Sequence, residues 1–360
     1  MVRVVVASDK FKGSLTSAEV AAAVRVGVRR VHPDATVVAV PVADGGDGTL
    51  AAAVAAGYAL VPVVASGPTG LPVRSGYARL GDTAVVELAD VCGLVRLPGV
   101  LAPMTASSFG VGELIGAAVD AGCSRVIVGI GGSASTDGGR GLVHALTGSL
   151  SLDADVLRAR LDGVHLVVAC DVDNPLTGPR GAAAVYGPQK GASPSQVADL
   201  DARLAEWADR VAALTGRDLR ETPGAGAAGG VGFAALALLG AELRPGIELV
   251  LELVRFRSLI VGADLVITGE GALDEQTLHG KAVAGVAAAA SGVPVVAVCG
   301  VNKLPPERLA AVGVRAAYAL TDLEPDVARC IAEPIPLLEK LAERIASEHL
   351  TMAGTREGSA

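Results

Sequence analysis

Acidic residues and glycines directly follow five short apolar runs of this chain. The runs cover residues 2–6, 37–42, 126–130, 166–169 and 265–267. Buried parallel strands have short continuous apolar sequences, and open α/β sheets bind ligands beyond the carboxyl ends of such strands. Glycine lets the backbone approach an anion, while carboxylates hold Mg²⁺ or accept a proton. The repeated pattern therefore predicts one crevice for a phosphorylated ligand and a metal ion.

The first two of these segments stand before predicted helices. Asp9, Lys10 and Lys12 lie in a strand-to-helix turn, where the helix N-terminus favours a carboxylate or a phosphate. A solvated turn explains the same residues equally simply. The second segment places Asp44 and Asp47 three residues apart. Helix capping accounts for one of these aspartates but not for the three glycines beside them, which favours a functional loop.

The glycine-rich segment after the third run allows two interpretations. Residues 129–134 match a loose G-x-G-x-x-A pattern, which indicates a dinucleotide site when a helix follows directly. Gly138 and Gly139 fall where that helix should continue, and glycine disfavours a helix interior. A nest of backbone N–H groups for phosphate fits better. The chain has no G-x-S-x-G elbow, Walker A motif or protein-kinase signature, so a phosphotransferase here belongs to a separate lineage.

Oxygen ligands and cations also follow the last two runs. Asp171, Asp173 and Asn174 gather after the fourth run. Glu270, Asp274 and Lys281 flank a predicted glycine-rich loop that leads into a helix, a grouping suited to phosphate and Mg²⁺. Between them, residues 187–191 place Lys190 in a tight loop, and residues 223–230 supply backbone donors before an apolar helix. A flexible linker is the alternative for 223–230. Of the five histidines, His279 alone stands near these loops.

The elements that position these residues alternate between strand and helix. The amino-terminal part predicts strands 2–7 and 36–42, and the carboxyl-terminal part predicts strands 264–268, 294–299 and 315–320. Helices are expected to start near Ser14 or Thr16 and after Gly48, and to cover 280–290, 306–312 and 334–349. This alternation implies right-handed crossovers and a doubly wound parallel sheet. We therefore expect a discontinuous α/β domain (1–61 and 259–350), an inserted α/β domain (62–258), a ligand crevice between them, and a frayed tail (351–360).

The composition excludes several classes of function. Only 2% of the 360 residues are aromatic and the formal charge is −8, which disfavours both stacking on single strands and binding to duplex nucleic acid. Five separated cysteines favour reduced thiols. Glycine and proline interrupt the uncharged stretches 222–241 and 282–302, so membrane spans are not expected. With no signal-peptide pattern after Arg3, we expect a cytoplasmic protein.

Seven ordered motifs closely resemble those of the bacterial type I glycerate kinase family. They cover residues 7–15, 41–49, 130–139, 169–176, 186–192, 223–230 and 267–271, and the resemblance spans roughly residues 1–348. It implies a flavodoxin-like domain interrupted by a second α/β domain, and ATP-dependent phosphorylation of D-glycerate, typically to 2-phosphoglycerate. Two positions depart from the family. Ala272 stands where a long residue such as Arg is common, and Ser135-Thr136 replaces a more usual Thr-Asn; both changes are expected to tune affinity.

Phosphoryl transfer needs positioning and charge neutralisation more than covalent chemistry, so the roles are divided among these loops. We expect ATP and Mg²⁺ as cofactors and glycerate as the partner, in a monomer or homodimer. The expected nucleotide and phosphate ligands are Gly131, Gly132, Ser133, Gly226, Gly229, Gly230 and Lys281. The expected glycerate ligands are Asp9, Lys10, Lys12, Ser14, Asp44 and Asp47. The expected catalytic residues are Asp171, Asp137 and Lys190, and the expected metal ligands are Asp171, Asp47 and Glu270.

Two other functions remain open at this stage. The loose G-x-G-x-x-A pattern would suit a hydroxy-acid dehydrogenase that uses NAD(P). A metabolite-binding regulator could also retain this fold without any catalytic activity. Which carboxylate acts as the base, and which holds the metal, is likewise left open by the sequence.

Overall fold

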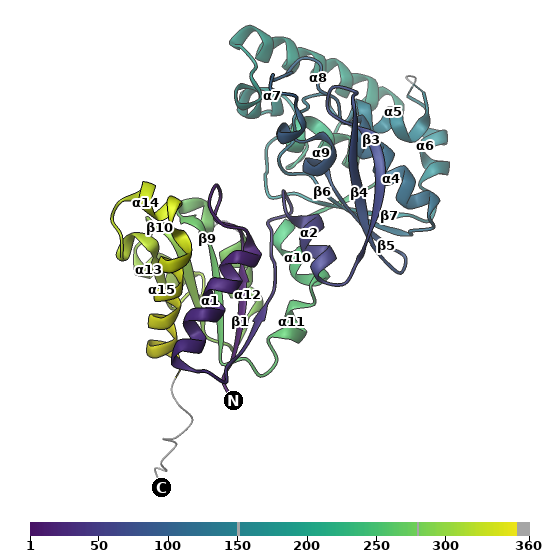
Figure 1. The fold of residues 1–360 in the computed structure, drawn as a ribbon. Helices are drawn as coiled ribbons and strands as arrows, with labels where there is room; N and C mark the ends of the chain where they lie inside the picture. The colour runs from purple at the N-terminus through teal and green to yellow at the C-terminus, as the bar shows by residue number, and fades with distance from the viewer. Residues whose placement is uncertain (150–151, 279–280, 351–360) are drawn as a thin grey trace. The chain divides into compact units, whose positions relative to one another are not determined.

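The protein is described by a computed structural model that covers residues 1–149, 152–278 and 281–350 (Figure 1). The expected tail 351–360 and His279 lie outside these residues. The chain forms two compact units, Met1–Asp44 with Val250–Ala360 and Gly45–Leu249. These limits fall earlier than the expected 61/62 and 258/259. The physical reason at the first limit is that α2 (Thr49–Ala55) packs against strands β4 (Pro72–Leu80) and β5 (Thr83–Glu87) of the second unit.

The first unit is built on a five-stranded parallel sheet in the order β11-β10-β9-β1-β2. Counted along this unit alone, the order is 2-1-3-4-5, that of a flavodoxin-like doubly wound fold. Figure 1 shows how the purple and the yellow-green ends of the chain combine in this unit. The sheet joins distant segments, since Val4 pairs with Val37 on one side and with Leu265 on the other. Its strands are β1 (Arg3–Ser8), β2 (Thr36–Ala39), β9 (Leu265–Leu273), β10 (Val295–Asn302) and β11 (Ala316–Ala319).

Helices cover both faces of this sheet, which explains why its strands are apolar throughout. Helix α1 (Ser17–Val31) begins with the expected capping box, in which Thr16 and Glu19 satisfy each other's backbone N–H groups. It packs closely on α15 (Pro334–His349), and both helices share one core cluster with Val4 and Val6. Helix α12 (Ala282–Ala289) contacts β1 and β9. The remaining helices of the unit are α11 (Phe256–Leu259), α13 (Pro306–Ala311) and α14 (Val327–Ala332).

The second unit contains a six-stranded mixed sheet in sequence order, β3 to β8. Strands β3, β4 and β5 are antiparallel, whereas β5 to β8 run parallel, so the carboxyl ends of β5, β6 and β7 meet at one edge. The strands are β3 (Ala59–Ser66), β4 (Pro72–Leu80), β5 (Thr83–Glu87), β6 (Arg125–Gly129), β7 (His165–Ala169) and β8 (Glu242–Arg244). The helices are α2, α3 (Leu88–Cys92), α4 (Phe109–Asp120), α5 (Arg140–Thr147), α6 (Ala154–Arg160), α7 (Ala182–Tyr186), α8 (Pro194–Thr215) and α9 (Ala227–Ala237). Helix α10 (Gly246–Leu253) begins in this unit and ends in the first.

Two strand ends differ from the expectation. Strand β2 stops at Ala39 rather than at residue 42, because Pro41 has no backbone N–H to continue the ladder. Strand β9 does not end before its glycines: it continues through Gly269 and Gly271 to Leu273, and it pairs with β10 as far as Asn302. The segment 269–271 is therefore strand and not the loop that its glycines suggested.

No helix among the described residues combines the length and the apolar character needed to cross a bilayer. The uncharged stretch 222–241 forms α9 and the residues around it, and 282–302 forms α12 followed by β10.

Candidate active site

The expected site residues of the first unit gather at the carboxyl ends of β1 and β9. Asp9 N donates to Gly269 O at 2.9 Å, which ties the turn after β1 to β9. A Cβ atom at Gly271 would lie only 3.2 Å from Lys12 N, so this turn rests against the strand that carries Glu270. In the flavodoxin-like order, the place between these two strands is the switch point where ligands bind.

The turn after β1 is held by its own backbone and by two of the expected ligands. Phe11 is buried, and its N–H donates to Leu15 O at 2.8 Å. The Ser14 hydroxyl donates to Phe11 O at 3.2 Å, and Asp9 Oδ1 accepts from Lys10 N at 2.7 Å. Ser14 therefore contributes to the shape of the turn, whereas the Lys12 side chain is exposed.

Glu270 is the most perturbed acid of this group. Burial raises the pKa of its carboxyl to about 7, with the negative charges of Asp9 and Asp274 adding to the rise. The hydroxyl of Thr277 donates to its Oε1 at 2.5 Å and opposes that rise, as does the charge of Lys281. The Lys281 ammonium itself donates to Gln276 Oε1 at 2.6 Å. A carboxyl that titrates near neutrality beside two further acids is a suitable place for a cation.

In the second unit, close backbone packing brings three loops to one edge of the sheet. A Cβ atom at Gly45 would lie 2.7 Å from Ala169 Cβ at the end of β7, and one at Gly129 would lie 2.6 Å from Gly45 O. A Cβ atom at Gly131 would meet Gly46 Cα at 2.6 Å. The glycines here are therefore needed for the loops to approach one another.

Asp47 and Asp171 stand on two of these converging loops. Both side chains are exposed. Asp171 Oδ1 accepts from Gly246 N at 2.8 Å, and Gly246 Cα also lies 2.7 Å from the place a Cβ of Gly45 would take. The loop after β7 and the Asp47 turn thus share Gly246 as a neighbour.

Glu87 is a buried acid at this edge that the sequence analysis missed. It ends β5, and its Oε2 accepts from Gly48 N at 3.2 Å and from Leu50 N at 2.8 Å at the start of α2. Burial raises its pKa, although these two hydrogen bonds oppose the rise. The sequence signal that could have identified Glu87 is its place at the end of a β-branched run, directly before a helix. Glu87 holds the turn that carries Asp47.

Lys190 and Asp137 are both engaged by protein groups. Lys190 is 2% exposed, and its ammonium donates to Ser133 Oγ at 2.9 Å and to Ser135 O at 2.5 Å. Burial lowers its pKa to about 8, and the charge of Asp137 opposes this. Asp137 Oδ2 accepts at 2.8 Å from both the N–H and the hydroxyl of Ser108. These two residues fix the shape of the loop between β6 and α5.

The glycines of 226–230 pack against neighbouring backbone. A Cβ atom would lie 2.2 Å from Pro175 O at Gly226, 2.1 Å from Ser135 O at Gly229, and 2.6 Å from Gly138 Cα at Gly230. Ala228, Gly229 and Gly230 adopt left-handed angles and interrupt α9. This segment is therefore a docked turn, and the linker alternative does not hold.

The dinucleotide pattern at 129–134 lacks the helix that it requires. After β6 the chain forms an extended loop, in which Ser133 bridges to Gly93, and α5 starts only at Arg140. The first glycines of a dinucleotide fingerprint should open the helix directly. The local structure thus gives no support to a dehydrogenase.

Within the described ranges, no three His, Cys, Asp or Glu side chains are grouped to hold a metal ion. Mg²⁺ is usually bound by only one or two carboxylates together with substrate phosphates and water. In the first unit, the neighbouring carboxyls of Asp9 and Glu270 would supply the one or two carboxylates that such a site requires. Asp47 and Asp171 provide two more carboxylates in the second unit.

Comparisons with known proteins agree on one family. A protein-family model described as "Glycerate kinase family" matches residues 4–155 and 148–350 of this chain. The chain is 46% identical over 323 residues to "Glycerate kinase" of Bacillus subtilis (strain 168), covering 83% of this chain and 85% of the relative. It is 42% identical to "Glycerate 2-kinase" of Escherichia coli (strain K12), with the same coverage. A crystal structure from Salmonella typhimurium LT2, designated glycerate kinase 2, superposes with a TM-score of 0.78 at 38% identity, covering 96% of this chain and 97% of that one.

Proposed function

The chain belongs to the glycerate kinase family, and from this premise we propose that it transfers the γ-phosphoryl group of ATP to the 2-hydroxyl group of D-glycerate. The products would be 2-phosphoglycerate and ADP. The observation that carries the proposal is the position of Glu270 and the Asp9–Ser14 turn at the switch point between β1 and β9. The choice of the 2-hydroxyl is supported by the relative named glycerate 2-kinase.

The lysines of the first turn are proposed to bind the substrate. Lys10 and Lys12 would pair with the glycerate carboxylate, and Asp44 would accept from its hydroxyl groups. Ser14 would act through the turn that it stabilises. Lys281 would bind a nucleotide phosphate from the start of α12, where the helix N-terminus adds favourable dipoles.

Asp171 is proposed as the general base. Its exposed carboxylate would take the proton of the attacking hydroxyl while that oxygen bonds to the γ-phosphorus, and the bond from phosphorus to the β,γ-bridging oxygen breaks. Glu270 would hold Mg²⁺ with Asp9, and Asp47 is a further candidate ligand. When bound, this ion would neutralise charge on the phosphate oxygens. Lys190, Asp137 and the glycines 226, 229 and 230 would position the loop 131–133, whose backbone N–H groups would bind phosphate.

A coupled assay for ADP release in the presence of D-glycerate tests this function. We expect glycerate-dependent ADP release that needs Mg²⁺, and phosphorus NMR of the product should give the signal of the 2-phosphate. A signal for the 3-phosphate would contradict the proposed position of transfer. Binding of glycerate without any ADP release would instead support a non-catalytic regulator, and a glycerate-dependent change in NADH absorbance would support a dehydrogenase.

A further inference from the structure

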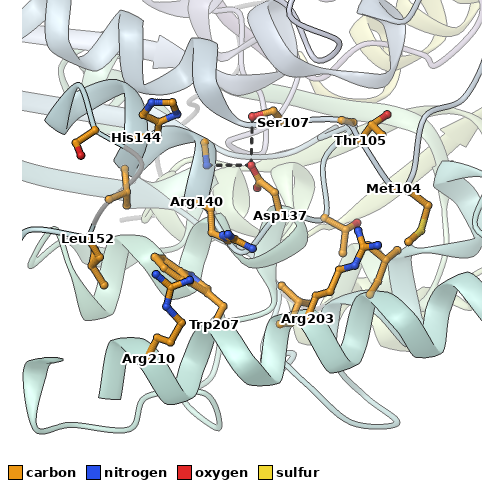
Figure 2. Close-up of a pocket in the computed structure, with 17 residues that line it drawn as sticks. Met104, Thr105, Ser107, Asp137, Arg140, His144, Leu152, Arg203, Trp207 and Arg210 are labelled. Carbon is orange, nitrogen blue, oxygen red and sulfur yellow. Dashed lines mark hydrogen bonds between the residues drawn. The ribbon is translucent and has the colours of Figure 1, made fainter. Parts of the chain in front are cut away.

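A cavity of about 310 Å³ lies within the second unit, between α5, α8 and the segment 104–107 (Figure 2). Its volume falls at the lower end of the range of small-molecule sites in proteins. Apart from the backbone-bonded Asp137, none of the residues proposed above for glycerate, ATP or Mg²⁺ lines it. The cavity therefore has no role in the proposed transfer of a phosphoryl group to glycerate.

Three arginines give this cavity a strong positive charge. Arg140 comes from the first turn of α5, and Arg203 and Arg210 come from α8. None of the three forms an ion pair with another residue in the described part of the chain. The one acid that lines the cavity is Asp137, and Ser108 and Gly141 already donate to its carboxylate. Among the described residues, no carboxylate therefore pairs with these three exposed guanidinium groups.

Trp207, which lines the cavity, contacts two of these arginines. Trp207 is 5% exposed, and its indole N–H donates to Gly138 O at 3.0 Å. The guanidinium carbons of Arg140 and Arg210 lie 5.5 Å and 5.7 Å from the centre of the indole ring. Figure 2 shows both side chains beside this ring, whereas Arg203 lies nearer the start of α8. Cation–π contacts at these distances orient the two guanidiniums before any ligand arrives.

The lining of the cavity also includes a buried hydroxyl that the described residues leave unpaired. Thr136 lines the cavity and is 5% exposed, yet its Oγ1 has no hydrogen-bond partner among the described residues. Buried hydroxyls in native proteins are nearly always paired with protein, water or ligand. This oxygen is not accessible from the cavity, so the binding of a ligand there depends on the three arginines.

We propose that this cavity binds a small phosphate-bearing anion with at least two negative charges. Guanidinium groups match phosphate oxygens through paired hydrogen bonds, and three of them around one hollow exceed what a single charge requires. A row of arginines on a helix is often a solvated face, but here two helices place the three arginines around one cavity. The phosphates could belong to a nucleotide or to a separate phosphorylated metabolite.

Intrinsic fluorescence can test the proposal, because Trp207 is the single tryptophan of the chain. Pyrophosphate and ATP are titrated separately into the full-length protein, with calorimetry as a second measurement that does not depend on the indole. We expect saturable binding of at least one of them. Arg203→Gln should weaken that binding by at least tenfold, whereas Arg217→Gln, an exposed arginine outside the cavity, should leave it unchanged.

The two sources of phosphate are separated by steady-state kinetics of the same variants. A rise in the KM for ATP in Arg203→Gln would assign the cavity to the nucleotide. An unchanged KM for ATP, together with lost pyrophosphate binding, would assign it to a separate metabolite. The proposal is overturned if neither probe binds saturably, or if Arg203→Gln binds as well as Arg217→Gln. Because binding is measured directly, this result does not depend on whether glycerate is the substrate.

Discussion

Thr277 donates its hydroxyl hydrogen to Glu270 Oε1 at 2.5 Å, from the short helix Glu275–Leu278 that follows β9. This bond fixes the orientation of a carboxyl whose burial raises its pKa to about 7. An acid kept in such an environment costs stability when it is charged, and groups of this kind concentrate at functional sites.

Replacing Glu270 should therefore stabilise the metal-free protein at alkaline pH. The pKa of Glu270 is higher in the folded than in the unfolded state. Its contribution to the free energy of unfolding is therefore fully present only below pH 4.5 and is lost as the pH rises through 7. Glu270→Gln, which can still accept from Thr277, should raise the free energy of unfolding by roughly 2 kcal/mol at pH 8, and by less at pH 5. Urea unfolding at both pH values measures this, with the exposed Glu275→Gln as the control. Equal effects at both pH values would contradict the pKa.

The same carboxyl should couple Mg²⁺ binding to pH. A metal ligand must lose its proton first, so the apparent affinity for Mg²⁺ should fall by about fivefold between pH 7 and pH 6. Glu270→Gln should lose this dependence together with most of its activity. The measurement is the Mg²⁺ concentration for half-maximal ADP release at each pH. A dependence that survives in the variant would remove Glu270 from the metal site.

Asp171→Asn should lower kcat by at least ~100-fold, the scale of general base catalysis. The asparagine oxygen can still accept from Gly246 N, so the loop after β7 should keep its shape and the thermal midpoint should not change. Asp173→Asn is the matched control, because its exposed carboxylate has only a loose ion pair with Arg180 at 3.5 Å. Turnover close to that of the unsubstituted enzyme would exclude Asp171 from the chemistry.

Two glycines with similar φ angles can be compared to distinguish the cost of a left-handed backbone from the cost of a steric clash. Gly229 has φ +68° and Gly163 has φ +71°, but a Cβ atom would lie 2.1 Å from Ser135 O at Gly229 and would meet nothing within 4 Å at Gly163. Gly163→Ala should cost about 1–2 kcal/mol, the cost of a left-handed residue. Gly229→Ala should cost clearly more and should also raise the KM for ATP. Equal losses of stability would show that the loops do not pack as described.

Lys190→Met should weaken the fold and the nucleotide site together. It leaves Ser133 Oγ and Ser135 O without their donor, at a cost of about 1–3 kcal/mol for each unpaired buried group. For a positioning role we expect the KM for ATP to rise more than kcat falls. Chemical denaturation and steady-state kinetics give both quantities, with the exposed Lys340→Met for comparison. A loss confined to kcat would instead indicate direct contact with the transferred phosphoryl group.

The sequence predicts the first unit well where each signal is local. The valine run locates β1 within one residue, and of the two expected helix starts the Thr16–Glu19 capping box at Thr16 is correct, whereas Ser14 lies three residues too early. Local reasoning fails at Gly269–Gly271, because glycines that permit close pairing of β9 with β10 look like a loop when their partner strand is unknown.

The less predictable parts of the site depend on distant partners. The carboxyl of Glu87 accepts from the N–H groups of Gly48 and Leu50, far from it in sequence. Asp137 likewise accepts from Ser108 in another segment. Neither interaction leaves a pattern within a single stretch of sequence. The arginine cavity was missed for a related reason. Arg203 and Arg210 look like the solvated face of a long helix until α5 is placed beside it.

The position of β1 between β2 and β9 also determines when the first unit can form during synthesis. Its two neighbours are β2, which follows soon after it, and β9, whose pairing residues begin at Leu265. All six strands of the second sheet leave the ribosome before β9 does, and they pair in the order in which they emerge. The amino-terminal 44 residues must therefore wait with an unpaired strand edge until the insert is complete, a state in which an exposed edge can pair wrongly.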